Sequence, residues 1–270
     1  MELGCSTLLF GALPLDTALE GIARTGYTAI ELSAIQGMGD HLPADLSPAG
    51  YAEIRHKIED YGIAIESIGA STNLLDGGCA YRLVRLMKAA SLLGAPALTS
   101  GAGGVADDED SFKNVVRTMN ELAKTAQDYG VKISLKPHVG NAVYSTKTAL
   151  RLMKEVDTKW IGLNVDASHL WRTPELEIPE QTIPSLLPYL FTARIRDTKG
   201  RERPIGPVEN QIPGGGGAMN LPAVVNVFKQ KKGLRFITLE IVGTHASTDP
   251  DYVNSVIRAC YDKLHPMVVG

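Results

Sequence analysis

Short apolar runs alternate with longer segments of helical periodicity along the whole chain. The apolar runs are predicted strands, and they span residues 3–6, 29–32, 64–68, 97–100, 132–135, 162–165, 191–195 and 236–241. All are short and mostly apolar, as strands buried on both faces of a sheet should be. The segments between them carry apolar stripes with a period of roughly 3.6 residues, such as Tyr51, Ile54, Ile58 and Tyr61. This alternation predicts a series of parallel βα units.

Residues that begin and end helices support these boundaries. Asp16 and Ser47 stand just before helical stretches and are predicted N-caps, because their side chains can accept hydrogen bonds from the first free N–H groups. The motifs "RTGY", "DYGI", "LLGA" and "DYGV" each place a glycine where a helix gives way to a strand. A further helical stripe is predicted to face the core, and it comprises Phe112, Val115, Met119, Leu122, Ala126 and Tyr129.

Eight such units within 270 residues predict a single (β/α)8 TIM barrel that occupies residues 1–270 as one domain. An open, doubly wound sheet would give the same local pattern. However, the first strand is followed by "STLLFGALPLD" and not by the glycine fingerprint of dinucleotide-binding sheets. The glycine-rich "IPGGGGAMN" follows the seventh strand and is predicted to lie in a loop over the active site.

Composition narrows the range of partners. With 44% hydrophobic residues, 21% charged residues and a formal net charge of -3, the chain has ample core material but no basic surplus for nucleic acid or an anionic membrane. No long apolar segment or signal peptide is evident, so we expect a cytoplasmic protein without membrane partners. Cys5, Cys79 and Cys260 are far apart, and we expect them to be buried without forming a metal or redox site. Homo-oligomerisation is left open.

Ionisable residues end the strands of the second half of the chain. In a TIM barrel, catalytic groups lie at these carboxyl ends. The candidates are Lys136 and His138 in "ISLKPHVG", Asp166 and His169 in "NVDASH", Arg194, Arg196 and Lys199 in "ARIRDTKG", and Glu240 in "FITLEIV". Glu240 is the most informative candidate. Burying a carboxylate within an apolar strand costs free energy, so such a residue is expected to be paired with a cation or to take part in catalysis.

These four motifs, together with the eight-unit layout, resemble the xylose-isomerase-like barrels of the sugar phosphate isomerase/epimerase superfamily, and the resemblance covers essentially the whole chain. Members typically bind one divalent metal through a glutamate, an aspartate, a histidine and a second glutamate on strands five to eight. The resemblance places Asp166 and Glu240 at two of these ligand positions, and His169 at the position of a histidine that touches substrate. Lys136 and Arg194 stand where the other two ligands would be.

The charges of these four residues bear on metal binding. Lys136, Arg194, Asp166 and Glu240 sum to zero, and neither cation has a lone pair to offer a metal. We therefore expect no cofactor, with a divalent metal such as Mn or Mg as the less favoured alternative. The two cations are predicted to supply the positive charge that a metal supplies in relatives. The superfamily's DNA-repair endonuclease branch is not expected, since the chain has only six histidines and a negative net charge.

The resemblance and the residues together predict an isomerase or epimerase that removes a proton next to the carbonyl of a small sugar, keto-sugar or sugar acid. The predicted catalytic residues are Glu240 as base, Lys136 and His169. The predicted substrate-binding residues are Arg194, Asp166, His138, Arg196 and Lys199. Two alternatives stay open: a lyase that uses Lys136 as a Schiff-base nucleophile or acts by elimination, and a non-catalytic carbohydrate-binding barrel.

Overall fold

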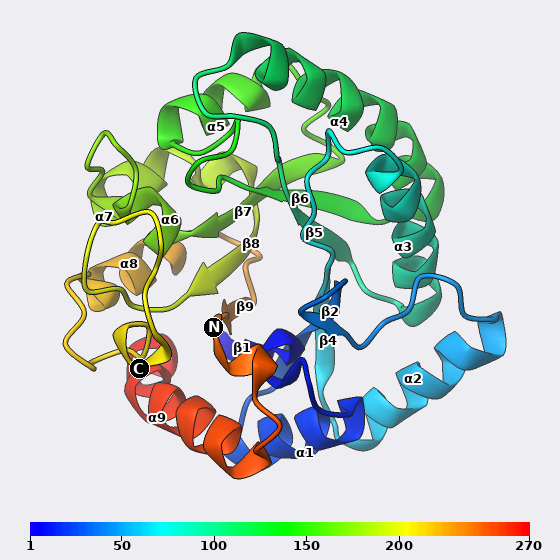
Figure 1. Ribbon diagram of the computed structural model, residues 1–270, viewed down its shortest axis with the longest axis vertical. Coiled ribbons are helices and arrows are strands. Elements are labelled where there is room, and N and C mark those ends of the chain that lie inside the picture. The colour runs from blue at the N-terminus through cyan, green and yellow to red at the C-terminus, as the bar shows by residue number, and fades with distance from the viewer.

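The computed structural model describes all 270 residues, Met1 to Gly270, and shows a closed barrel of parallel strands surrounded by helices (Figure 1). The barrel strands are β1 (Glu2–Ser6), β2 (Ala29–Ile35), β4 (Ala64–Gly69), β5 (Ala97–Gly101), β6 (Lys132–Lys136), β7 (Ile161–Asp166), β8 (Leu190–Ile195) and β9 (Phe236–Leu239). The pairing of β1 with both β2 and β9 closes the barrel. The predicted (β/α)8 architecture is confirmed.

The predicted strand positions agree with the observed ones to within a few residues. The main differences are that β2 continues to Ile35, where a short antiparallel strand β3 (Gly39–Asp40) pairs with it, and that β9 ends at Leu239. Glu240 was predicted to lie within the eighth strand but is the first residue after it. Its backbone N–H still donates to the Ile195 carbonyl at 3.4 Å, so the residue stays aligned with the barrel wall.

The helices form the outer layer in Figure 1 and follow the strands in sequence. They are α1 (Leu15–Thr25), α2 (Pro48–Asp60), α3 (Cys79–Leu93), α4 (Glu109–Tyr129), α5 (Thr146–Met153), α6 (Ala167–Trp171), α7 (Pro179–Thr182), α8 (Leu221–Phe228) and α9 (Pro250–Val269). No helix combines the length and the apolar character needed to cross a membrane.

The cap predictions were mostly right. Ser47 is the N-cap of α2 and accepts from the Gly50 N–H at 3.2 Å. The prediction for Asp16 was wrong, because α1 begins at Leu15, two residues earlier than an N-cap at Asp16 implies, with Pro14 as its N-cap. Asp16 lies in the first turn, where its carboxylate pairs with Lys57 at 2.8 Å. All four predicted helix-ending glycines adopt a positive φ, as their place at helix ends requires.

The apolar stripes face the core with one exception. The predicted α4 residues are buried or packed against the core. Tyr61 is 38% exposed, because α2 ends at Asp60 and the chain turns before the stripe is complete.

The inside of the barrel is polar, although the strand sequences are mostly apolar. Successive strand residues face opposite sides, so the apolar ones pack under the helices while every second residue points inward. On β6 and β7 the buried inward-facing residues include Ser134 and Asn164. On β8 they are Thr192 and Arg194, and the Thr192 hydroxyl lies 2.8 Å from that of Ser134. Charged groups can therefore stand inside this barrel among hydrogen-bonding neighbours.

The glycine-rich loop lies between β8 and α8, as predicted. It is fastened at Gln211, a fully buried residue whose side chain donates to the Val242 carbonyl at 2.8 Å and accepts from the Val242 N–H at 3.0 Å. The Gln211 carbonyl accepts from the Asp197 N–H at 2.9 Å. The loop is thereby attached to the segments that follow both β8 and β9.

Gly162 provides a test of the close packing at the start of β7. A Cβ atom at this position would lie 2.4 Å from the Phe191 ring. Gly162→Ala should lower the free energy of unfolding by roughly 2 kcal/mol or more, the scale of overpacking a core. Gly77→Ala is the control, because nothing lies within 4 Å of its added Cβ. Urea unfolding followed by circular dichroism measures both, and equal stability of the two variants would contradict the packing described here.

Candidate active site

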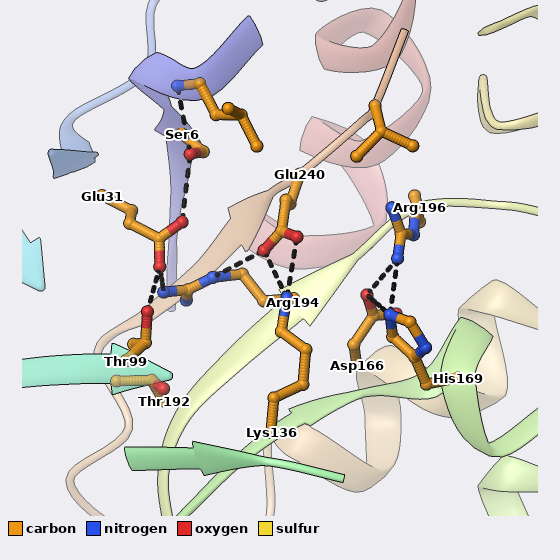
Figure 2. Close-up of polar contacts among 12 residues, drawn as sticks. Ser6, Glu31, Thr99, Lys136, Asp166, His169, Thr192, Arg194, Arg196 and Glu240 are labelled. Carbon is orange, nitrogen blue, oxygen red and sulfur yellow. Dashed lines mark hydrogen bonds and ion pairs between the residues drawn. The ribbon is translucent and has the colours of Figure 1, made fainter. Parts of the chain in front are cut away.

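Arg194 of β8 is the buried centre of the charged groups inside the barrel, with no exposed surface. Its guanidinium forms an ion pair with Glu31 of β2, pairs with Glu66 of β4 at 3.2 Å and donates to the Ser67 hydroxyl at 2.9 Å. Its Nε lies 3.5 Å from the Glu240 carboxylate (Figure 2). One cation thus connects three carboxylates contributed by distant parts of the chain.

The Glu31 carboxylate is held by further hydrogen bonds. The Ser6 hydroxyl donates to one of its oxygens at 3.0 Å, and the Thr99 hydroxyl donates to the other at 2.6 Å. A Cβ atom on Gly69 would lie 2.9 Å from the Glu31 carboxyl carbon, so the glycine leaves room for this group. Burial disfavours ionisation of Glu31, but the charges of Arg194 and Lys136 outweigh it and lower its pKa.

Glu66 differs from Glu31 in the direction of its pKa shift. Burial raises the pKa of Glu66, and the nearby Arg194 charge offsets this only in part. The Ser67 hydroxyl donates to the same carboxyl group at 2.6 Å. Within this network Arg194 and Lys136 carry two positive charges against three glutamates, and a protonated Glu66 would bring the sum to zero.

Lys136 and Glu240 form the end of the network that is nearest to the mouth of the barrel. The Lys136 ammonium donates to both oxygens of the Glu240 carboxylate, at 2.7 and 2.6 Å (Figure 2). Their side chains are 12% and 11% exposed, whereas Arg194 beneath them is fully buried. A small molecule at the carboxyl ends of the strands would therefore meet this pair first.

A second cluster surrounds Asp166 at the end of β7. One oxygen of its carboxylate accepts from the N–H and the hydroxyl of Ser168, at 2.9 and 2.7 Å. The other lies 2.9 Å from Arg196, which also lies 2.9 Å from His169 Nε2. Arg172 contacts the opposite ring nitrogen of His169 at 3.2 Å. The imidazole is thus flanked by guanidinium groups on both sides.

These cations control the ionisation of the cluster. Burial raises the pKa of Asp166, but the charges of Arg196 and Lys136 reverse this and bring it to about 2. Burial and the charge of Lys136 lower the pKa of His138 to about 4. Burial, the neighbouring His138 and the charges of Arg196, Arg172 and Lys136 also lower the pKa of His169. The centres of the two imidazole rings lie 4.0 Å apart. Both histidines are therefore neutral near pH 7, in a positive local field.

The structure brings most of the predicted residues together and separates two. Lys136, Glu240, Asp166, His169, His138 and Arg196 all lie at the carboxyl ends of β6 to β9. Arg194 was predicted to touch substrate, but its guanidinium lies one layer deeper, beneath Glu240. Lys199 is exposed, beside Gly216 of the glycine-rich loop, and forms no ion pair.

Sequence reasoning missed Glu31, Glu66 and Arg172. The first two interrupt apolar strands in "AIELS" and "AIESIG". This is the signal that identified Glu240, and applied to every strand it would have found them. Arg172 follows the short helix α6 and carries no comparable signal.

The sequence of this barrel matches a known family of proteins. The sequence fits the family described as xylose isomerase-like TIM barrel over residues 19–260. The chain belongs to this family. Among curated relatives, an inosose dehydratase from Glaesserella parasuis serovar 5 (strain SH0165) is 26% identical over 174 residues, which cover 58% of this chain and 54% of the dehydratase. The match therefore spans about half of the dehydratase's length.

Two solved structures share the fold of this xylose isomerase-like barrel over nearly their full length. The IOLI protein with a binding zinc atom is 20% identical, with a TM-score of 0.78 and coverage of 99% of this chain and 98% of that one. D-psicose 3-epimerase in the presence of D-fructose is 16% identical, with a TM-score of 0.77 and complete coverage of both chains (100% each). Identities this low show a shared fold only.

The donor set of this xylose isomerase-like barrel does not fit a divalent metal. No group of three or more His, Cys, Asp or Glu side chains is arranged to hold one. Both Glu240 oxygens are bound by Lys136, and one Asp166 oxygen lies 2.9 Å from Arg196. A protonated lysine or arginine cannot ligate a metal, because it has no free lone pair.

The central ion pairs should be essential for stability. Arg194→Met should lower the free energy of unfolding by about 3 to 5 kcal/mol, because it leaves buried carboxylates unpaired. Adding Glu31→Gln and Glu66→Gln should restore part of the loss, since the uncompensated charges are then removed.

The control for this experiment is Arg24→Met. This substitution breaks the ion pair between Arg24 and Glu20, whose side chains are 78% and 57% exposed, respectively. It should lower the free energy of unfolding by less than about 1 kcal/mol. Denaturant unfolding of all four proteins gives the comparison. An Arg194→Met variant as stable as Arg24→Met would contradict the central role of this guanidinium.

Proposed function

We propose that this chain is an enzyme that removes a proton next to the carbonyl of a small sugar, keto-sugar or sugar acid. The outcome would be isomerisation, epimerisation or elimination of water. The observation that carries the proposal is the Lys136–Glu240 pair at the mouth of the barrel, a base and a cation in direct contact at 2.6 Å. A dehydratase and an epimerase among the similar proteins are compatible with such chemistry.

In the proposed reaction, Glu240 is the base and Lys136 the electrostatic partner. The substrate carbonyl oxygen accepts a hydrogen bond from the Lys136 ammonium in place of one Glu240 oxygen. The released oxygen takes the proton from the adjacent carbon, and the electron pair moves onto the carbonyl oxygen as an enolate. Lys136 stabilises that oxygen. Return of the proton to the opposite face gives an epimer. Return to the former carbonyl carbon, with the neighbouring hydroxyl proton moving to the enolate oxygen, gives an isomer. Transfer of the proton from Glu240 to a β-hydroxyl, which leaves as water while the enolate re-forms the carbonyl, gives elimination.

Arg194 supports this pair from below. Its Nε lies 3.5 Å from Glu240, and the ion pairs to Glu31 and Glu66 fix its orientation. A guanidinium at this distance adds a second positive charge, after Lys136, beside the carboxylate that acts as the base. We propose that Lys136 and Arg194 together supply the positive charge for enolate formation without a divalent metal.

The proposed substrate is anionic. Around His169, the cations Arg172 and Arg196 face the single charge of Asp166, and both histidines are neutral, so the cluster sums to +1. The Nη1 atom of Arg196 has no hydrogen-bond partner although the residue is only 3% exposed. A carboxylate or phosphate of the substrate would satisfy this donor and balance the charge.

Two other functions would use the same residues. A Schiff-base lyase needs the Lys136 nitrogen free to attack a carbonyl carbon, but this nitrogen donates to both Glu240 oxygens. A non-catalytic carbohydrate-binding barrel would retain the positive cluster and bind sugar acids without turnover.

The proposed roles make a kinetic prediction. Glu240→Gln and Lys136→Met should each lower kcat by about 100-fold or more, the scale of losing one preorganised catalytic group. A panel of keto-sugars, sugar acids and sugar phosphates provides the substrate, and circular dichroism confirms folding. Borohydride reduction in the presence of substrate should leave the mass of Lys136 unchanged. Folded variants with nearly normal kcat would rule out the mechanism, and a covalent adduct on Lys136 would favour the lyase.

Substrate charge can be tested separately. Arg196→Gln should raise KM for an anionic substrate by about 10-fold or more, since a charge-assisted hydrogen bond is lost. KM for a neutral analogue of the same substrate should change less. Lys199→Gln is the comparison, because this exposed residue lies apart from the cluster and should have a smaller effect. Equal effects of Arg196→Gln on charged and neutral substrates would exclude the anion contact.

A further inference from the structure

A cavity of about 640 Å³ opens at the amino-terminal ends of the strands, opposite the Lys136–Glu240 pair. It is lined by the first residues of β4, β5, β6, β8 and β9 and by the segment that joins α8 to β9. Its walls include the rings of Phe191 and Phe236. Barrel enzymes carry their chemistry at the other end, so this cavity is not part of the proposed active site.

The cavity is strongly cationic. Lys132, Lys231, Lys232 and Arg235 line it. Arg235 forms an ion pair with Glu2 at 2.7 Å. The three lysines of the cavity have no carboxylate partner, since the lysines of this chain that form ion pairs are Lys57, Lys113 and Lys136. In a chain whose formal net charge is -3, three unpaired lysines around one cavity are a local excess that an anion would neutralise.

Two of the three lysines, Lys231 and Lys132, make specific contacts beside the cavity. The Lys231 ammonium donates to the Pro188 carbonyl at 3.1 Å, and burial together with the Lys132 charge lowers its pKa. The Lys132 ammonium lies 4.5 Å from the centre of the Phe191 ring. Two cations therefore face the same space despite their mutual repulsion, beside an aromatic surface.

The one carboxyl group in the lining does not balance this charge. Glu66 reaches the cavity wall, but its carboxyl group is bound to Arg194 at 3.2 Å, and burial raises its pKa. The lining thus has lysine donors and an apolar, aromatic wall without a free acid.

We propose that this cavity is a second ligand site, which binds a small phosphorylated molecule with an aromatic or apolar part. The phosphate would accept hydrogen bonds from Lys132, Lys231 and Lys232, and the apolar part would pack against Phe191 and its neighbours. The cavity has the size of a small-molecule site. Because the cavity lies at the opposite end of the barrel from the Lys136–Glu240 pair, its ligand would be distinct from the substrate. This inference is independent of the proposed reaction.

Phenyl phosphate and inorganic phosphate are suitable probes, with calorimetry as the measurement. Phenyl phosphate should bind in the cavity about 5-fold or more tighter than inorganic phosphate, because the ring adds apolar contact. The triple variant Lys132→Gln, Lys231→Gln, Lys232→Gln should bind it about 10-fold or more weakly, since the charge-assisted hydrogen bonds are lost.

The matched control removes the same charge elsewhere. Lys124→Gln, Lys147→Gln, Lys154→Gln replaces three exposed lysines that do not line the cavity, and it should bind like the unchanged protein. Arg196→Gln, at the opposite end, should also leave this binding unchanged. Three outcomes would overturn the proposal: no saturable binding, equal losses in the two triple variants, or a loss in Arg196→Gln alone, which would place the phosphate at the barrel mouth.

Discussion

The guanidinium of Arg194, fully buried in the barrel, determines how the other charged groups are arranged. A cation in such a place must be matched by negative charge, because transfer from water is otherwise very costly. Glu31 and Glu66 provide this charge from strands on the other side of the barrel, and Ser6 and Thr99 satisfy the remaining oxygens of Glu31. The polar interior of the barrel follows from this requirement.

The same requirement separates the site into two layers with different properties. In the lower layer, Arg194, Glu31 and Glu66 are buried and are fixed by their mutual contacts. In the upper layer Lys136 and Glu240 are partly exposed and hold one another, so a ligand can exchange with either partner. Asp166 and Arg196 form a similar pair beside them. Burial, together with the surrounding positive charge, lowers the pKa of His169 and keeps it neutral near pH 7. A rigid buried layer of charges that supports a pair able to exchange its partners is an arrangement suited to preorganised electrostatic catalysis.

The sequence was sufficient to predict the barrel and most of the residues at its mouth. The eight alternating units determine the architecture, and the architecture places Lys136, Asp166 and Glu240 at neighbouring strand ends. The depth of each side chain was harder to predict. Same-face residues on a strand are about 6.6 Å apart along its axis, so Arg194 lies a full layer below Arg196, although both were assigned to the mouth.

Pairing across the barrel could not be read from the strand period alone. Between β2 and β4 the register shifts, so that Glu31 pairs with Ser67 while Ile30 pairs with Ile65. Glu66 occupies the extra position. A simple alternation of inward and outward residues would not direct both Glu66 and Ser67 toward Arg194, yet both contact it. Irregularities of this kind depend on the packing of the whole barrel, which no single segment encodes.

The room that Gly69 leaves beside Glu31 has a consequence for how such a site can arise during evolution. A larger residue at position 69 would collide with the Glu31 carboxyl group, and Glu31 without Arg194 would be a buried anion without a counter-ion. Each single substitution on the way from a different interior would therefore be destabilising until its partners were present. The evolution of this network therefore requires uncharged residues such as glutamine at the glutamate positions as intermediates. The alternative is an ancestor stable enough to tolerate the loss of folding free energy. The network is consequently expected to be inherited as a unit, with its members changing together between lineages.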